Sequence, residues 1–251
     1  MSGIRRVAIG MAVVILWAVT ASAQTCPCPA EPPPGNWVGS AGLGFAINKG
    51  NTDTTNLNVS FDATYDPKKK DLWKFQGLYL RGETDGEPTV DRLFLLGRYE
   101  RDIGERAFAF GQAQYLRDEF KEIDSLIATS AGFGYKLVAT DRLSLSADAG
   151  AGVSWEKNPG FDVDTSAVIT AGDQLEFKVT PTATITQSFA ALWNADDFGD
   201  ALYTFNVGFS TSVSKQIELK IELLDTYKTK PPNDLLKKND VAMLTAIVYK
   251  F

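Results

Sequence analysis

The chain has 251 residues, of which 44% are apolar, 11% aromatic and 22% charged, a composition that excludes a wholly disordered protein. It contains no histidine, which excludes His-dependent triads and most zinc and copper sites. The formal net charge of −6 argues against a general nucleic-acid binder, because phosphate binding requires clustered Lys and Arg. Two cysteines are too few for a disulfide scaffold.

Residues 1–23 have the three parts of a secretory signal peptide. Arg5 and Arg6 precede an uncharged apolar run from Val7 to Val19, and a small-residue cleavage site ends at Ala23. The run is shorter than the ~20 residues that span a bilayer, which disfavours a membrane anchor. We therefore expect export and cleavage after Ala23.

Residues 24–36 form a proline-rich segment, which we expect to be an extended periplasmic leader. Cys26 and Cys28 lie within it. The Thr and Gln that precede Cys26 do not suit lipid attachment, and two cysteines at this spacing are a weak metal or redox motif. We therefore interpret the segment as a solvated tail.

From Trp37 onwards the sequence alternates between apolar and polar residues, the pattern of a strand with two different faces. The clearest run is Gln216 to Leu223, with four aliphatic and four polar side chains. The weakest is 105–117, where Phe108 and Phe110 compete with Ala107 and Ala109 for the outward face. The pattern predicts twelve strands in one all-β domain spanning 37–251, at about 37–48, 53–65, 71–82, 89–101, 105–117, 125–138, 142–156, 161–171, 174–191, 200–214, 216–229 and 239–251.

The connections between these runs alternate in length. Short turns are expected around 67–70, 103–104, 139–141, 172–173 and 214–215, and longer polar loops near 82–88, 118–124, 157–162, 194–200 and 229–240. Outer-membrane barrels have an even number of antiparallel strands, short periplasmic turns and longer external loops. The sequence therefore predicts a twelve-stranded transmembrane β-barrel in the outer membrane, with both termini in the periplasm.

A soluble β-sandwich or barrel would also show alternation, but it would not need aromatic residues at its strand ends. Interfacial aromatic girdles are typical of membrane barrels. The residues that favour such girdles are Trp37, Trp73, Tyr79, Tyr99, Tyr115, Tyr135, Trp155, Tyr227 and Tyr249. The final strand ends in Tyr249 and Phe251, which resembles the sorting signal that the barrel assembly machinery reads during insertion.

The polar faces of the predicted strands should line the lumen and carry charges of both signs. The candidates are the basic residues Lys74, Arg92, Arg98, Lys178, Lys220 and Lys250 and the acidic residues Asp62, Glu100, Asp148, Glu176, Glu218 and Glu222. An ion-selective pore would be expected to show a ring of one sign. Balanced charges should instead pair in the lumen. We expect a constricted lumen with a small, weakly selective conductance.

Three acidic clusters are expected in the external loops: Glu83-Asp85-Glu87, Asp118-Glu119-Glu122-Asp124 and Asp196-Asp197-Asp200. None has the spacing of a calcium-binding loop, and we predict no metal or cofactor site. A solvated surface explains these acids, and a role in sharing Mg²⁺ or Ca²⁺ with lipopolysaccharide phosphates is the alternative.

The segment Gly42 to Asn58, which contains the turn Gly50-Asn51-Thr52-Asp53-Thr54-Thr55, resembles the opening hairpin of the DUF481 family of salt-induced outer-membrane proteins of the YdiY type. The stretches 91–100, 117–120 and 131–135 are also similar to that family. The resemblance covers about 37–251 and implies a small outer-membrane barrel. It implies no catalytic residues, because the family has no established activity.

Two function classes follow from these observations. The first is a structural or envelope-stress barrel that contacts outer-membrane lipid and lipopolysaccharide, and the alternative is a narrow channel for ions or small solutes. An enzyme is disfavoured, because the outer-membrane phospholipases, palmitoyl transferases and aspartyl-type proteases rely on histidine. The sequence does not predict an oligomeric state.

Overall fold

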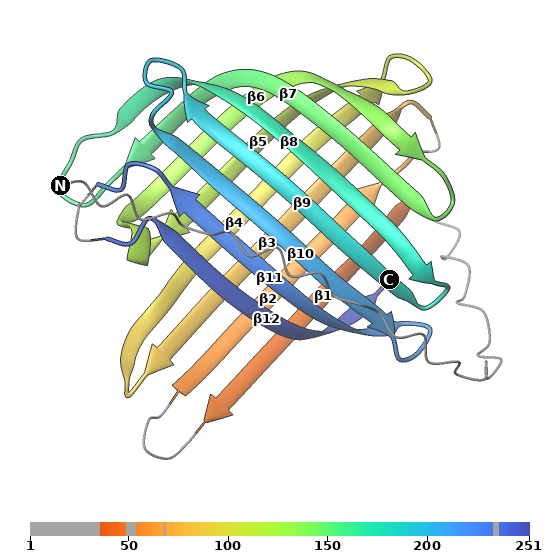
Figure 1. Cartoon of the computed structure of the whole chain (residues 1–251), viewed down its shortest axis with the longest axis horizontal. Helices are drawn as coiled ribbons and strands as arrows, with labels where there is room; N and C mark the ends of the chain where they lie inside the picture. Colours follow the sequence, from red (N-terminus) through yellow and green to blue (C-terminus); the bar gives the residue numbers. More distant parts are fainter. Residues whose placement is uncertain (1–35, 49–53, 68, 233–235) are drawn as a thin grey trace, which may run out of the picture.

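Twelve β-strands follow one another along the chain and close into an antiparallel barrel (Figure 1). The computed structural model describes residues 36–48, 54–67, 69–232 and 236–251. The predicted signal peptide, all of the leader except Asn36 and the predicted 50–53 turn therefore lie outside the described residues. The strands are β1 (Trp37–Asn48), β2 (Thr54–Tyr65), β3 (Asp71–Thr84), β4 (Glu87–Asp102), β5 (Ala107–Asp118), β6 (Ile123–Ala139), β7 (Leu143–Lys157), β8 (Asp164–Thr180), β9 (Ala183–Asn194), β10 (Ala201–Ser212), β11 (Ile217–Lys228) and β12 (Asn239–Lys250).

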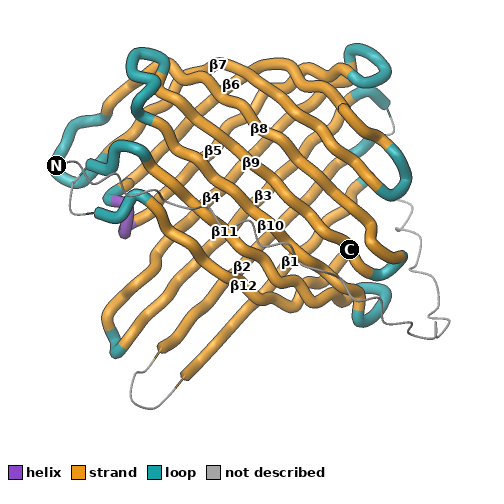
Figure 2. Tube along the Cα trace, in the orientation of Figure 1, coloured by secondary structure: helices purple, strands orange, loops and turns teal. Residues whose placement is uncertain are grey.

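Each strand pairs with its sequence neighbours, and β12 returns to pair with β1. A single short 3₁₀ helix, η1 (Glu119–Lys121), is described between β5 and β6 (Figure 2). No helix in the described ranges is long and apolar enough to cross a membrane. The start of β1 and the end of β12 lie at the same end of the barrel, where Gly39 and Phe251 exchange two backbone hydrogen bonds of 3.0 Å. We call this end periplasmic, following the arrangement of outer-membrane barrels.

The alternation in the sequence becomes an inward and an outward face. On β11 the outward side chains Leu219, Ile221 and Leu223 are 41–51% exposed, whereas Leu224 and Thr226 on the inward face are buried. Large outward apolar side chains are exposed on eleven of the twelve strands, all except β5, as expected for a surface that faces lipid and not water. Asp225 is an exception, because it is a charged residue on this outward face.

Aromatic side chains gather at both ends of the outward face. At the periplasmic end, the rings of Trp73 and Tyr99 lie 4.7 Å apart, and those of Trp37 and Tyr65 lie 5.0 Å apart. At the other end, the indole N–H of Trp193 donates to the hydroxyl of Tyr203 at 2.9 Å. Tyr and Trp place an apolar ring in lipid and a polar group at the interface, so the two clusters mark the boundaries of the bilayer.

Two predicted boundaries are wrong. The pattern placed a turn at 172–173, but β8 runs through these residues and turns at Pro181 and Thr182. Gly172 lies inside β8, where a Cβ would lie 2.9 Å from the Phe189 carbonyl oxygen, so here glycine allows β8 and β9 to pack closely and does not mark a turn. The predicted long loop at 82–88 is a two-residue hairpin, in which Asp85 and Gly86 have φ angles of 53° and 83°. These left-handed angles are those of a type I′ turn, which suits Asp-Gly.

The barrel closes unevenly between its first and last strands. Every other pair of neighbouring strands is aligned over at least eleven residue pairs, but β1 and β12 are aligned only from Ser40–Lys250 to Leu43–Ile247. Beyond this point the β1–β2 and β3–β4 hairpins project away from the rest of the barrel (Figure 1). The outer half of β12 therefore pairs only with β11.

Candidate functional site

The lumen is the candidate site, and its periplasmic half is crossed by an inner charge network of Lys74, Arg98, Glu100 and Asp148. Arg98 donates from Nε to Glu100 at 2.7 Å, from Nη1 to Gln112 at 2.8 Å and from Nη2 to Asp148 at 2.8 Å. Lys74 donates to the same Glu100 carboxylate at 2.9 Å. All four residues are among those predicted to face the lumen. Such fully paired charges are held in fixed positions and offer little to a passing ion.

Two aromatic rings lie beside this network. Phe108 and Phe110 are 3% and 4% exposed, so both side chains face inward and the outward face of β5 carries Ala107 and Ala109. The guanidinium of Arg98 lies 4.0 Å from the centre of the Phe110 ring, within the range of a cation–π interaction.

Glycines on the inner wall make room for these rings. A Cβ on Gly134 would lie 2.1 Å from the Phe108 ring, and one on Gly150 would lie 3.0 Å from Phe110. In the stretch Gly132-Phe133-Gly134, Gly134 makes room for the Phe108 ring, whereas Gly132 allows the backbone of β7 to approach, since a Cβ there would lie 2.1 Å from the Ala149 carbonyl oxygen.

The opposite wall carries further predicted lumen residues, whose ion pairs lie within one strand or join two neighbouring strands. Lys220 pairs with Glu222, and Lys250 pairs with Glu218 at 2.6 Å. Asp62 is close enough to Lys220 to interact with its charge. Glu176 and Lys178 are exposed near the periplasmic end of β8, and no ion pair involves them among the residues that the structure describes. These two residues lie three strands from β11, not the two that the misplaced turn predicted.

The extracellular half of the lumen is bridged directly. The Nη1 atom of Arg92 on β4 donates to the Thr226 hydroxyl on β11 at 2.7 Å and lies 3.5 Å from Asp118. By the shorter way around the barrel, β4 and β11 are five strands apart, so this hydrogen bond crosses the lumen. Lys228 on β11 also pairs with Glu156 on β7, which is four strands away.

Apolar side chains fill the space between these bridges. Leu116, Ile123, Leu126 and Leu202 are at most 9% exposed and pack with Phe94 into a cluster that we call the extracellular plug. Leu202 lies on β10, five strands from Leu116 on β5, so the plug joins opposite walls. An apolar contact of this kind leaves little room for water between the side chains that form it.

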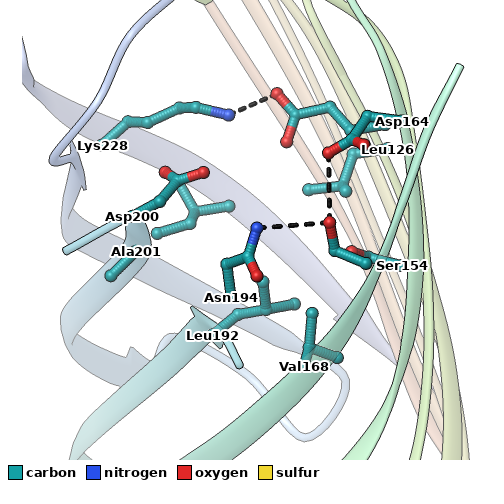
Figure 3. A pocket seen from close by; sticks show the side chains of 12 residues that line it. Leu126, Ser154, Asp164, Val168, Leu192, Asn194, Asp200, Ala201 and Lys228 are labelled. Carbon is teal, nitrogen blue, oxygen red and sulfur yellow. Dashed lines mark hydrogen bonds and ion pairs between the residues drawn. The ribbon is translucent and has the colours of Figure 1, made fainter. Parts of the chain in front are cut away.

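A small pocket remains beside the plug (Figure 3). Its volume is about 30 Å³, which is enough for one or two water molecules. Its polar lining is linked by short contacts, in which Asn194 donates to Ser166 at 3.2 Å and Ser166 donates to Asp164 at 3.1 Å. No group of three or more Cys, Asp or Glu side chains suited to a metal ion occurs in the described ranges.

The sequence missed several residues of the extracellular half because they lie at strand ends. Asp118 was predicted in an external acidic cluster, but it is buried in the lumen beside Arg92. Lys121 is 2% exposed and contacts Asp240 at 2.8 Å. A charged residue at a strand end usually indicates a solvated loop. The one signal for an inward direction is that Asp118 lies two residues after Leu116 on β5 and so shares its face.

Two acids of the β9–β10 loop are affected in opposite directions. The ammonium group of Lys230 holds the pKa of Asp197 below its usual value, and the Gly199 N–H, 2.9 Å from the carboxylate, adds to this effect. Burial raises the pKa of Asp200, which lines the small pocket. The structure thus shifts the pKa values of two carboxyl groups that are close in sequence in opposite directions.

We expect Lys230→Ala to raise the pKa of Asp197 towards its usual value and to raise further the pKa of Asp200, because the Lys230 charge opposes the effect of burial on Asp200. Since the Asp197 pKa is depressed in the fold, its interaction stabilises the loop above the unfolded-state pKa and is lost as the pH falls through the folded-state pKa. Carboxyl ¹³C NMR titration of the barrel in micelles measures both groups. An unchanged Asp197 titration in the variant would contradict this assignment.

The outward rim above the lipid-facing belt carries two arginines around one acid. Arg117 donates to Asp91 at 2.6 Å, and Arg81 lies 3.9 Å from Asp91 and 2.8 Å from Glu83. The arginine side chains are 47% (Arg81) and 44% (Arg117) exposed, whereas that of Asp91 is only 12% exposed. Asp91 therefore holds the guanidinium of Arg117, and Glu83 holds that of Arg81, while both groups still present N–H donors to the surroundings.

Comparison with known proteins places this barrel in a family. The DUF481 family, described as a protein family of unknown function, matches residues 41–251. The "Uncharacterized protein YdiY" of Escherichia coli (strain K12) is 21% identical over 202 residues, which are 80% of this chain and 78% of that protein.

A solved outer-membrane channel has a similar fold. The COG4313 outer-membrane channel of Pseudomonas putida F1 has a TM-score of 0.50 at 13% identity and covers 92% of this chain and all of its own. The translocator domain of the autotransporter NalP from Neisseria meningitidis has a TM-score of 0.49 at 11% identity, covering 89% and 91% of the two chains. The predicted twelve-stranded outer-membrane-type barrel and the predicted family are both confirmed, and the chain belongs to the DUF481 family.

Proposed function

We propose that this protein is an outer-membrane barrel whose resting lumen is closed and which acts through its surface, as a structural or envelope-stress component. The hydrogen bond between Arg92 and Thr226 carries the proposal, because it joins two walls of the barrel across the lumen. The extracellular plug and the inner charge network add two further layers of closure. In this reading the signal peptide at 1–23 exports the chain to the outer membrane.

A swelling assay with proteoliposomes tests the closed lumen. We expect wild-type vesicles in an isotonic solution of a small neutral sugar to swell no faster than protein-free vesicles. The double variant Leu126→Ala and Leu202→Ala removes apolar volume from the plug and should increase the swelling rate. Leu219→Ala is the matched control, because Leu219 is 47% exposed on the outward face.

Heat-modifiable mobility on gels confirms that each variant has folded before its vesicles are compared. Rapid swelling of wild-type vesicles would contradict the closed lumen and favour the narrow channel. The mixed signs of the lumen charges would then give that channel weak ion selectivity. Equal, slow swelling of the folded double variant and the wild type would show that the plug does not limit passage.

The surface partner that we propose is lipopolysaccharide, bound through its phosphates by Arg81 and Arg117. Both guanidiniums are exposed at the extracellular rim, and arginine binds phosphate with two parallel hydrogen bonds. This replaces the acidic clusters as the expected contact, since Asp118 is buried and Asp197 is paired with Lys230.

Changing both residues to alanine should reduce the lipopolysaccharide that co-purifies with the barrel, because two phosphate-binding groups are lost. Arg101→Ala is the matched control, since Arg101 is 59% exposed at the periplasmic end. Phosphate analysis of purified, folded barrels measures the bound lipid. Equal amounts in the double variant and the wild type would remove these arginines from the proposal.

A further inference from the structure

The outer half of β12 leaves the wall of the barrel and passes inside β1. A Cβ on Gly44 would lie 2.0 Å from the carbonyl oxygen of Thr245, so at this point the backbone of β12 crosses the inner side of β1. The side-chain amide of Asn58 donates to the same carbonyl at 3.3 Å. Glycine is required at position 44, since any larger residue would collide with backbone there.

The crossing strand is held on the far side of the mouth. Lys121 of η1 is 2% exposed and contacts Asp240 at 2.8 Å and the Lys238 carbonyl at 3.3 Å. Because η1 joins β5 to β6, this contact ties β12 to the opposite wall. We call Lys121 and Asp240 the latch.

The displacement of β12 leaves backbone groups on the outer part of β1 without a partner strand on this side, within the described part of the chain. The β1–β12 register, continued outward from Leu43–Ile247, would align Phe45 with Thr245 and Asn48 with Ala242. Unpaired backbone groups are costly in a bilayer, where no water replaces the missing hydrogen bonds. Val241 and Met243, whose side chains are exposed, lie on this part of β12.

We infer that the outer half of β12, residues 239–246, is a gate with two positions. In the latched position seen here it lies across the mouth and helps to close the lumen. In the second position it pairs with residues 44–48 of β1, which closes the side of the barrel and draws β12 away from the mouth. The exchange trades the ion pair between buried Lys121 and half-exposed Asp240 for several ladder hydrogen bonds, so two packings of one segment compete. The inference rests on the proposed closed lumen.

A reversible crosslink tests the gate in the full-length barrel. Cysteines replace Phe45 and Thr245, and serines replace Cys26 and Cys28. In the Leu126→Ala and Leu202→Ala background, which removes apolar volume from the plug, oxidation should fix β12 against β1 and raise the conductance in planar bilayers above that of the reduced protein, and reduction should reverse the change. If the crosslink forms quantitatively but conductance is the same in both states, the gate is wrong. If no crosslink forms in the folded barrel, β12 cannot reach β1 and the gate is also wrong.

Two substitutions test the strand crossing and the latch separately. Gly44→Ala removes the space for the crossing, and Lys121→Met removes the charge of the latch, so each should raise the yield of the Phe45–Thr245 crosslink. Gly111→Ala is the control, because a Cβ there meets nothing within 4 Å. Unchanged crosslink yield in both folded variants would overturn the inference. Wild-type conductance equal to that of the oxidised barrel would instead overturn the closed lumen, so the two failures are distinguishable.

Discussion

Replacing Val207 with arginine is expected to destabilise the barrel by about 2–4 kcal/mol, because it places a charge near the middle of the bilayer. Val207 lies opposite Leu223, between Phe205 and Phe209 on the outward face of β10. Leu223 lies midway along β11, between Ile217 at the periplasmic end and Tyr227, whose ring lies 6.3 Å from that of Tyr203. Urea-dependent folding into lipid vesicles measures the change in free energy.

Two further arginine substitutions test how the penalty depends on depth in the bilayer and on which face of the barrel carries the charge. Leu219→Arg should cost less than Val207→Arg, since Leu219 is nearer the periplasmic interface, and the penalty falls towards the interfaces. Thr184→Arg should cost least, because Thr184 lies on the inward face of β9. Equal losses at Val207 and Thr184 would reverse the assignment of the two faces.

Gly152→Ala is expected to reduce the free energy of unfolding by about 1–3 kcal/mol, the usual cost of forcing extra volume into a packed site. A Cβ on Gly152 would lie 1.7 Å from the Thr129 carbonyl oxygen and 2.7 Å from the Ser130 Cα. Both atoms belong to the backbone of β6, so the strand itself would have to move. The same vesicle-folding assay measures the loss.

Gly111→Ala provides the comparison for this variant. Position 111 is also inside a strand but has free space around a Cβ, so alanine there should be neutral or stabilising by a few tenths of a kcal/mol to ~1 kcal/mol. If both substitutions change stability by the same amount, close packing between β6 and β7 is not the reason for Gly152.

The fold was largely predictable because each strand has to present one apolar face to lipid. This requirement gives a period of two, which is visible in β11 from Ile217 to Leu223 without any other information. The misplaced turn at 172–173 shows the limit of the pattern. Gly172 and Asp173 are common turn residues, and the alternation continues unbroken through the real turn at Pro181 and Thr182. Only the pairing of β8 with β7 shows which of the two sites is the turn.

The candidate site was predictable in its residues but not in its contacts. The period of two assigned Arg98 and Asp148 to the lumen, but they lie on β4 and β7, and sequence gives no distance across a barrel. Phe108 was harder, since an aromatic residue is expected on the lipid face and its place in the lumen depends on Gly134 of the next strand. Lys121 gave no signal at all, because its burial depends on Asp240 at the far end of the chain.

Single-channel recording of the wild-type protein in planar bilayers tests the closed lumen most directly. With Arg92 bonded to Thr226 across the lumen and the extracellular plug in place, we expect a closed baseline with at most small, weakly selective current steps. A large, stable and strongly ion-selective current from the folded wild-type barrel would contradict the closed lumen.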